Sequence, residues 1–370
     1  MSYIAKMKIK QVTDILEELA PLVHAEDFDN VGLLVGDVEA EVKGILVTLD
    51  TMENVVDEAI ATDCNLIVSF HPIIFGGLKK LTGRTYVERV VIKAIQNGIA
   101  IYSMHTALDN VQEGVNGKIC EILGIAHPKI LIPKKGTIEK LVTYVPLKDA
   151  EALRTSLFEA GAGNIGKYSD CSFSTQGTGS FKAGEQAHPV KGEIGEIHYE
   201  EETQIHVIYS KSHRSRILKA LFENHPYEEV AYELFVLENT DQNIGMGMVG
   251  ELPEPVDETE FLERVKQKMN VSVIRHSRLL EHKVNRIAIL GGSGAFAIEA
   301  AKGSGAQIFI TSDIKYHEFY KAEDKIVIAD IGHYETEQFT KTLLVDYLTK
   351  KIPNFAIRLA ESKTNPIKYL

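Results

Sequence analysis

The chain has 370 residues, of which 44% are hydrophobic and 25% are charged, so it is long enough for two or three domains with a sizeable core. Its formal net charge of −12 argues against general binding to nucleic acids or membrane surfaces, because both need a basic protein surface. The N-terminus has no apolar segment of secretory length, no apolar run reaches the roughly 18 residues of a membrane span, and the three cysteines are scattered. We therefore expect a cytoplasmic protein with reduced thiols and no membrane contact.

The first block of the chain, residues 1–126, alternates predicted helices and apolar strands. In chain order these are a helix at 9–22 that ends at Pro21, a strand at 44–50, a helix at 54–61, a strand at 65–69, a helix at 86–97 and a strand at 99–103. This βαβαβ alternation predicts a mostly parallel sheet with helices on its faces.

The middle block, residues 127–243, has a different pattern. It opens on a predicted linker at 127–136, and the Gly- and Ser-rich segment 161–184 is predicted to be a mobile loop. The remaining elements are a strand at 140–146, a helix at 150–160, a strand at 203–209, a helix at 212–224 and a strand at 229–235. This order favours an inserted ferredoxin-like α+β domain.

The last block, residues 244–370, repeats the plan of the first. Strands are predicted at 285–290, 307–311 and 325–329, with glycine turns and a helix through Ala301 after the first of them. We interpret this as an internal duplication. The expected fold class is therefore α/β, with two duplicated three-layer halves that form one metal-binding domain around the insert.

Two pairs of polar residues follow the third predicted strand of each half. His105 and Asp109 follow the strand at 99–103, and His333 and Glu337 follow the strand at 325–329, both with i, i+4 spacing. Such a spacing presents an imidazole and a carboxylate from one face of a helical turn, which suits a divalent metal. Taken singly, each pair has a structural alternative as a helix cap or a surface pair.

A further histidine, His71, follows the second strand of the first half, and Asp313 holds nearly the same place in the second half. The carboxyl ends of parallel strands collect ligands, so all these residues are expected to face one crevice. Mixed imidazole and carboxylate ligands suit Zn²⁺, Mn²⁺, Fe²⁺ or Co²⁺. Two such carboxylates and two histidines are enough for two metals, which would activate a water molecule. Alone, His71 is more often a turn or core residue.

The stretch Gly291, Gly292 and Gly294 follows a predicted strand and opens a helix, as dinucleotide fingerprints do. The match is short, and the equivalent turn of the first half has no glycines. Three other interpretations stay open: binding of a substrate phosphate by the loop amides, close approach of another segment, and a simple turn.

Five segments of the outer blocks together resemble the GTP cyclohydrolase I type 2 homologue family, also called the Nif-three-like family. They are residues 28–36, 69–72, 105–109, 311–317 and 332–337. The middle block is similar to the PII/CutA-like insert of the longer bacterial members. The resemblance implies a toroidal homohexamer with a two-metal site facing an internal cavity.

For this chain, the resemblance implies metal ligands at His71, Asp109, His333 and Glu337, with two ions per subunit and zinc as the foremost metal. The family usually has two adjacent histidines before the proline, and here Phe70 takes the place of the first. That change removes one ligand, so one metal position is expected to be weak, completed by water, or empty. His105 is then expected to orient a ligand or, like Glu335, to transfer protons.

Two functions follow from these observations. One is a metal-dependent hydrolase that acts on a nucleotide or a related heterocycle, with a phosphorylated small molecule as its ligand. The other is a ring-shaped metal- or ligand-binding protein without catalysis, in which the insert acts as a sensor. Turnover across a panel of substrates separates the two.

Overall fold

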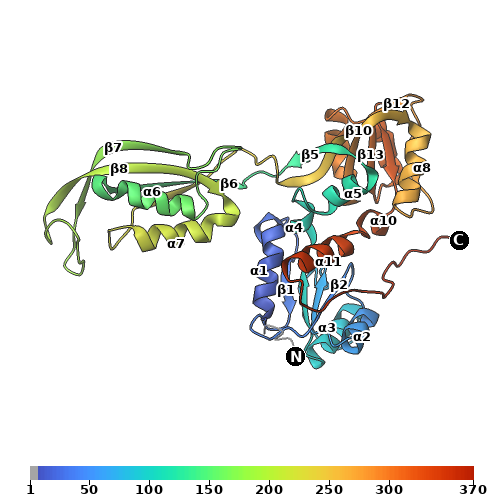
Figure 1. Ribbon diagram of the computed structural model, residues 1–370, viewed down its shortest axis with the longest axis horizontal. Helices are drawn as coiled ribbons and strands as arrows, with labels where there is room; N and C mark the ends of the chain where they lie inside the picture. The colour runs from blue at the N-terminus through green and yellow to red at the C-terminus, as the bar shows by residue number, and fades with distance from the viewer. Residues whose placement is uncertain (1–6) are drawn as a thin grey trace. The chain divides into compact units, whose positions relative to one another are not determined.

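The computed structural model describes residues 7–370 and divides the chain into two compact units (Figure 1). The first unit ends at Pro133 and resumes with Gln242–Leu370, and the second unit is Lys134–Asp241. The six N-terminal residues, where no secretory segment is expected, lie outside the described residues. No helix in the described part of the chain is long and apolar enough to cross a membrane.

The first unit contains a five-stranded sheet with the order β1-β4-β3-β2-β15. Its strands are β1 (Gly32–Val35), β2 (Ile45–Thr48), β3 (Leu66–Ser69), β4 (Ala100–Ser103) and β15 (Ile357–Leu359). All neighbouring strands are parallel except β1 and β4. Every residue of β2, β3 and β4 is buried, because α2 (Glu53–Ala61) and α3 (Tyr86–Gln96) cover one face while α1 (Ile9–Leu19) and α11 (Thr340–Lys351) cover the other.

A six-stranded sheet with the order β11-β14-β13-β12-β10-β5 completes the first unit. Its strands are β5 (Ala126–Pro133), β10 (Gly245–Asp257), β11 (Arg275–His276), β12 (Lys283–Ser293), β13 (Ile308–Ser312) and β14 (Val327–Asp330). The run β12-β13-β14 is parallel, as β2-β3-β4 is in the other sheet. Helices α5 (Val115–Leu123) and α8 (Glu258–Lys268) cover one face, and α9 (Ile298–Gly303) packs on the other.

Strands pair across the predicted blocks. β5, at the start of the middle block, pairs with β10 of the last block, while β15, from the last block, extends the sheet of the first beside β2. The prediction of a linker at 127–136 is therefore wrong over most of that range, because β5 occupies it as far as Pro133. Ile130 is buried in the core and lies opposite Met248 of β10. Backbone hydrogen bonds with β10 and apolar burial therefore stabilise this segment as a strand, although the prolines in its sequence disfavour one.

The second unit contains a four-stranded antiparallel sheet with the order β7-β8-β6-β9 and two helices. Its elements, in chain order, are β6 (Ile138–Pro146), α6 (Ala150–Glu159), β7 (Ser172–Lys182), β8 (Ile197–Ser210), α7 (Arg214–Asn224) and β9 (Tyr232–Val236). Leu153 and Leu157 of α6 and Ile217 of α7 pack on Leu141 and Ile205 of the sheet. Both helices therefore cover the same face.

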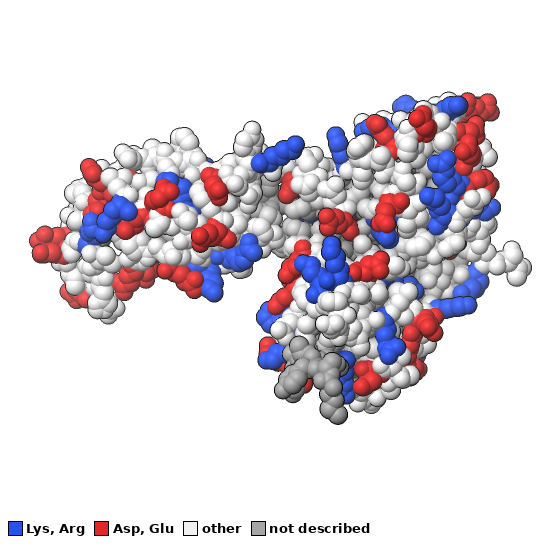
Figure 2. Space-filling model, in the orientation of Figure 1, with Lys and Arg blue, Asp and Glu red and all other residues white. Residues whose placement is uncertain are grey.

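Strand β7 lies within the segment that the sequence predicts to be a mobile loop. Its glycines and serines have low strand propensity. The strand nevertheless pairs with β8 from Ser172 opposite Val207 to Lys182 opposite Ile197. Pairing with a long partner strand therefore overrides local composition here. Across the face shown in Figure 2, acidic and basic side chains of the described residues are interspersed without an extended basic surface.

Candidate metal centre

The predicted ligands lie on segments that begin where buried parallel strands end. His71 follows β3, while α4 (His105–Asp109) follows β4 and α10 (His333–Glu337) follows β14. Helices α4 and α10 thus take matching places, each after the third strand of a parallel run. This placement directs their side chains to the edge of the sheets where ligands usually bind.

Residues from both ends of the chain converge on the Glu337 carboxylate. Nε2 of His71 and Nε2 of His333 lie 3.1 Å and 3.2 Å from Oε2 of Glu337. These three ligand atoms all lie within 4.8 Å of one another, and residues 7–370 contain no second group of three or more such ligands. Asp109 lines the same pocket as His333 and Glu337.

Each histidine of the site is oriented by a carboxylate on its other ring nitrogen. Nδ1 of His71 donates to Asp50 at 2.8 Å, and Nδ1 of His333 donates to Asp313 at 2.7 Å. These hydrogen bonds leave each Nε2 facing the centre. Metal-binding histidines are usually oriented in this way, by a hydrogen bond from the other ring nitrogen to a carboxylate. The motifs alone do not reveal this orienting role. The sequence predicts Asp313 at the crevice, and for Asp50 the available signal is that it ends the predicted strand at 44–50.

The two imidazoles and Glu337 strongly perturb one another. Burial by itself lowers the pKa of His71, but hydrogen bonds with Asp50 and Glu337 raise it to about 10. In the same way, Glu337 and Asp313 outweigh burial and raise the pKa of His333 to about 9. Burial raises the pKa of Glu337, yet the two imidazoles hold it down at about 2. The metal-free centre therefore holds two imidazolium groups around one carboxylate.

Asp109 is the residue that this arrangement leaves unsatisfied. Burial, and after it the negative charge of Glu337, raises the pKa of Asp109 well above its ordinary value. Oδ1 of Asp109 is buried and makes no hydrogen bond. Leaving such an atom unpaired is costly. The group of His71, His333 and Glu337, with the Asp109 carboxylate lining the same pocket, fits a divalent cation of the zinc, manganese, iron or cobalt type.

We expect metal binding to release protons. The pKa values of about 10 and about 9 mean that His71 and His333 are both protonated at pH 7 in the metal-free protein. A metal needs the Nε2 lone pairs, so binding at pH 7 should release about two protons. The affinity should also rise with pH until both imidazoles are neutral. Calorimetry in buffers of different ionisation enthalpy measures this release, and a buffer-independent enthalpy would contradict it.

The glycine stretch at the end of β12 serves close approach. A Cβ atom at Gly292 would lie 2.6 Å from Oε1 of Glu337, and one at Gly294 would lie 1.9 Å from Oγ1 of Thr311. The anion-loop interpretation is wrong for these three glycines, because internal acceptors already engage their amides. Gly291 N donates to Asn116 Oδ1, Gly292 N to Thr336 Oγ1 and Gly294 N to Ser312 O.

The variant Gly292→Ala is expected to weaken metal binding about 10- to 100-fold, because its methyl group displaces the Glu337 carboxylate. The positive φ of +71° at Gly292 adds backbone strain for alanine. Gly303→Ala is the matched control, since an added Cβ there meets nothing within 4 Å. Titration of both variants with Zn²⁺ tests the expectation, and equal affinities would refute it.

Phe70 supplies no ligand and belongs to the core. Its side chain is fully buried, and its ring centroid lies 4.9 Å from that of His71 and 5.5 Å from that of His105. The ring therefore forms an apolar wall directly behind the two histidines.

The structure places the two predicted proton-transfer residues differently. His105 lines the pocket, and its Nδ1 donates to Asp29 at 2.8 Å. It has a φ of +25°, a strained value for a residue other than glycine and one that often marks a functional site. Glu335 is buried outside the pocket lining, where its Oε1 accepts a hydrogen bond from Asn365.

The centre opens into a pocket of about 260 Å³. Phe28 and Phe296 both line it, although these side chains are 66% and 61% exposed. Met246 and Leu290 add further apolar surface, and no lysine or arginine is among the described residues that line the pocket. A planar, mainly apolar ring fits such a lining better than a phosphate group does.

The fold and the site define a mixed α/β protein with several sheets and a group of residues able to bind a metal. The family model Duf34/NIF3 (NGG1p interacting factor 3) matches residues 7–366. The chain belongs to this family, which confirms the resemblance seen in its motifs.

Similar proteins match almost the entire chain. A protein of Bacillus subtilis named GTP cyclohydrolase 1 type 2 homolog is 34% identical, with 98% of each chain covered. A protein of the same name from Staphylococcus epidermidis is 32% identical over 98% of this chain and 100% of its own. Among solved structures, a Bacillus cereus protein related to NIF3 superposes with a TM-score of 0.82, at 34% identity and 99% coverage of both chains.

Proposed function

We propose that this protein is a metal-dependent hydrolase that acts on a planar nitrogen heterocycle. The observation that carries the proposal is the grouping of two oriented imidazoles on the Glu337 carboxylate, with the buried and unsatisfied Oδ1 of Asp109 at the wall of the same pocket. The name of the Bacillus subtilis relative, a GTP cyclohydrolase homologue, agrees with a heterocyclic substrate.

The proposed ligands are His71, Asp109, His333 and Glu337. They would hold a divalent cation, with zinc as the first candidate. A second ion, expected from the family resemblance, would lack an imidazole at Phe70, so we propose that it is held weakly. When bound, the cation supplies Lewis-acid polarisation and makes water a stronger nucleophile at neutral pH.

The residues of the chain supply positioning and proton transfer. Phe28 and Phe296 hold the flat ring of the substrate in the pocket. Nδ1 of His105 is tied to Asp29, which leaves Nε2 of His105 to take a proton and return it to the leaving nitrogen. Burial raises the pKa of Asp29, but hydrogen bonds from His105 and Thr106 lower it below its ordinary value, so Asp29 stays ionised.

The test is turnover of guanine, guanosine and GTP by zinc- or manganese-loaded protein, followed by absorbance and mass spectrometry. We expect at least one ring to be hydrolysed, and His105→Asn to lower kcat by about 100-fold or more while the metal content stays unchanged. Full metal occupancy without turnover of any ring would refute the hydrolase.

That negative result would favour the second candidate, a non-catalytic metal- or ligand-binding ring. The observation in its favour is Phe70, which removes an imidazole from the place where the family usually has one. For either function we propose a homohexamer, which light scattering on the purified protein would detect.

We further propose that the outer blocks are a duplication and that the second unit is a ferredoxin-like, PII/CutA-like insert. The matching parallel runs β2-β3-β4 and β12-β13-β14 support the duplication. The β-α-β-β-α-β order of the second unit and its sheet order β7-β8-β6-β9 support the ferredoxin-like insert.

A further inference from the structure

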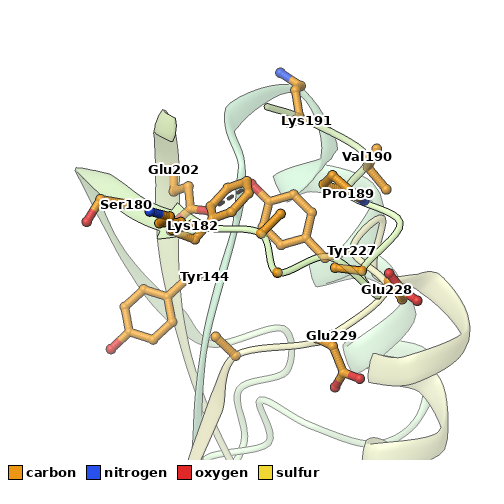
Figure 3. Close-up of a pocket in the computed structure, with 16 residues that line it drawn as sticks. Tyr144, Ser180, Lys182, Pro189, Val190, Lys191, Glu202, Tyr227, Glu228 and Glu229 are labelled. Atoms are coloured by element: carbon orange, nitrogen blue, oxygen red, sulfur yellow. Dashed lines mark hydrogen bonds between the residues drawn. The ribbon is translucent and has the colours of Figure 1, made fainter. Parts of the chain in front are cut away.

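The second unit has a pocket of its own, with a volume of about 440 Å³. This volume lies within the roughly 300–1,000 Å³ range of small-molecule sites. The walls come from the open face of the sheet, where Tyr144, Phe181 and Glu202 lie, and from the segments that carry Pro189 and Tyr227 (Figure 3). All of these residues belong to the second unit.

Hydrogen bonds and an ion pair within the second unit hold the loop that covers this pocket. The amide of His188 donates to Oε2 of Glu228 at 2.8 Å, which ties the loop to the segment that carries Tyr227. Nζ of Lys191 lies 2.6 Å from Oε1 of Glu200 on β8. Contacts within the protein thus fix the position of this loop over the pocket.

Most of the lining is apolar or aromatic. Phe181 and Tyr227 have ring centroids 6.2 Å apart, and Pro189 and Val190 lie on the neighbouring loop (Figure 3). Such a lining favours a ligand with a hydrocarbon or aromatic body. It does not by itself give the ligand a charge.

Lys182, Lys191, Glu228 and Glu229 also contribute charges to the pocket lining, but the one buried charged residue among those that line it is Glu202. Its side chain belongs to a residue that is only 9% exposed, and Figure 3 shows the Tyr227 ring directed toward it. Oε1 of Glu202 accepts a hydrogen bond from the Tyr227 hydroxyl at 2.8 Å. Among residues 7–370, nothing hydrogen-bonds to Oε2, and no lysine, arginine or histidine lies within ion-pair distance of this carboxylate.

The neighbouring strand leaves room for this unpaired oxygen. A Cβ atom at Gly179 of β7 would lie 2.2 Å from Oε2 of Glu202, so any side chain there would push the carboxylate away. Because Glu202 lines the pocket, a donor or a cation bound there can reach its carboxylate. The nearby Lys191 does not serve, since it is paired with Glu200.

We propose that this pocket binds a small, largely apolar molecule that carries a protonated amine, with the hydrocarbon body against Phe181 and Tyr227 and the ammonium group on Oε2 of Glu202. A cationic amine satisfies the free oxygen and neutralises the carboxylate, while a neutral or anionic molecule of the same shape does not. The site makes the second unit a ligand-binding module. It is independent of the proposed hydrolase.

Calorimetric titration of the full-length protein with three probes of similar shape tests the proposal. The probes are phenethylamine, 2-phenylethanol and 3-phenylpropionate. We expect the amine to bind at one site per chain and about tenfold more tightly than either of the others. Equal affinity for the amine and the alcohol, or no saturable binding of the amine, would overturn the proposal.

Two variants on β8 assign the site. Glu202→Gln keeps an acceptor for Tyr227 but removes the charge, so it is expected to weaken amine binding about tenfold and to leave the alcohol unchanged. Glu201→Gln, at the exposed neighbouring position, removes the same charge outside the pocket and is expected to change neither affinity. Equal losses of amine affinity in the Glu202→Gln and Glu201→Gln variants would refute the assignment. A Glu202→Gln protein of altered molecular mass would instead show an interface between copies and would also overturn it.

Discussion

Asp109→Asn is expected to stabilise the metal-free protein and, at the same time, to abolish tight metal binding. The buried carboxylate of Asp109 has an unpaired oxygen and faces the negative charge of Glu337. Asparagine has nearly the same shape without the charge, so the free energy of unfolding should rise by about 1–3 kcal/mol. Loss of an anionic ligand should weaken Zn²⁺ binding by at least about 100-fold. Thermal unfolding with and without Zn²⁺ measures both effects.

The stabilisation by Asp109→Asn should depend on pH in a defined direction. The folded-state pKa of Asp109 lies above its unfolded value, so the folded wild-type protein binds the extra proton. The contribution of this residue to stability therefore falls as pH rises above the unfolded pKa of about 4. At low pH the variant and the wild-type protein should have equal free energies of unfolding. As pH rises, the free energy of unfolding of the variant should exceed that of the wild-type protein by an increasing amount.

Asp346→Asn is the control for this pair of effects. Asp346 is exposed on α11 and lies outside the centre, so its variant should unfold and bind Zn²⁺ as the wild-type protein does. If Asp109→Asn left the metal-free protein less stable at neutral pH, the proposed cost of the buried carboxylate would be wrong.

Phe70→His is expected to add a metal ion and to lower stability. The phenyl ring is fully buried against His71 and His105, so an imidazole at this position would lie beside both of these histidines. We expect the bound metal to rise from about one ion to about two per chain. Replacing a buried aromatic ring by a smaller polar one should lower the free energy of unfolding by about 2–4 kcal/mol without metal.

Elemental analysis of dialysed protein and chemical denaturation measure these two changes. Phe70→Leu separates them, because it also perturbs the core but offers no ligand, so its metal content should equal that of the wild-type protein. An unchanged metal content in a folded Phe70→His protein would show that Phe70 does not stand in a ligand position.

The pairs that carry the candidate site could be predicted from the sequence because their geometry is local. The i, i+4 spacings of His105 with Asp109 and of His333 with Glu337 set their relative placement once the helical turns form. The roles of Asp50 and Asp313 could not be predicted in the same way. Each lies about twenty positions from its histidine, and only the parallel packing of neighbouring strands brings the two together.

The same distinction explains the errors in the predicted fold. Helix α1 and strands β2, β3 and β4 follow the predicted segments closely, because a helical apolar period and short apolar runs are local signals. Strands β5 and β15 depend on partners far along the chain, β10 and β2, and β7 depends on the next strand, β8. Pairing gives each of them backbone hydrogen bonds that its own composition does not predict.

The sequence by itself therefore determined the family, the alternation of elements in the outer blocks and the His and carboxylate pairs, since all of these are written in short stretches of chain. Only the tertiary structure decided which atoms stay unsatisfied. The unpaired oxygen of Asp109 and the two imidazoles on Glu337 are defined by what surrounds them in space, and burial turns these ordinary residues into a place that fits a cation.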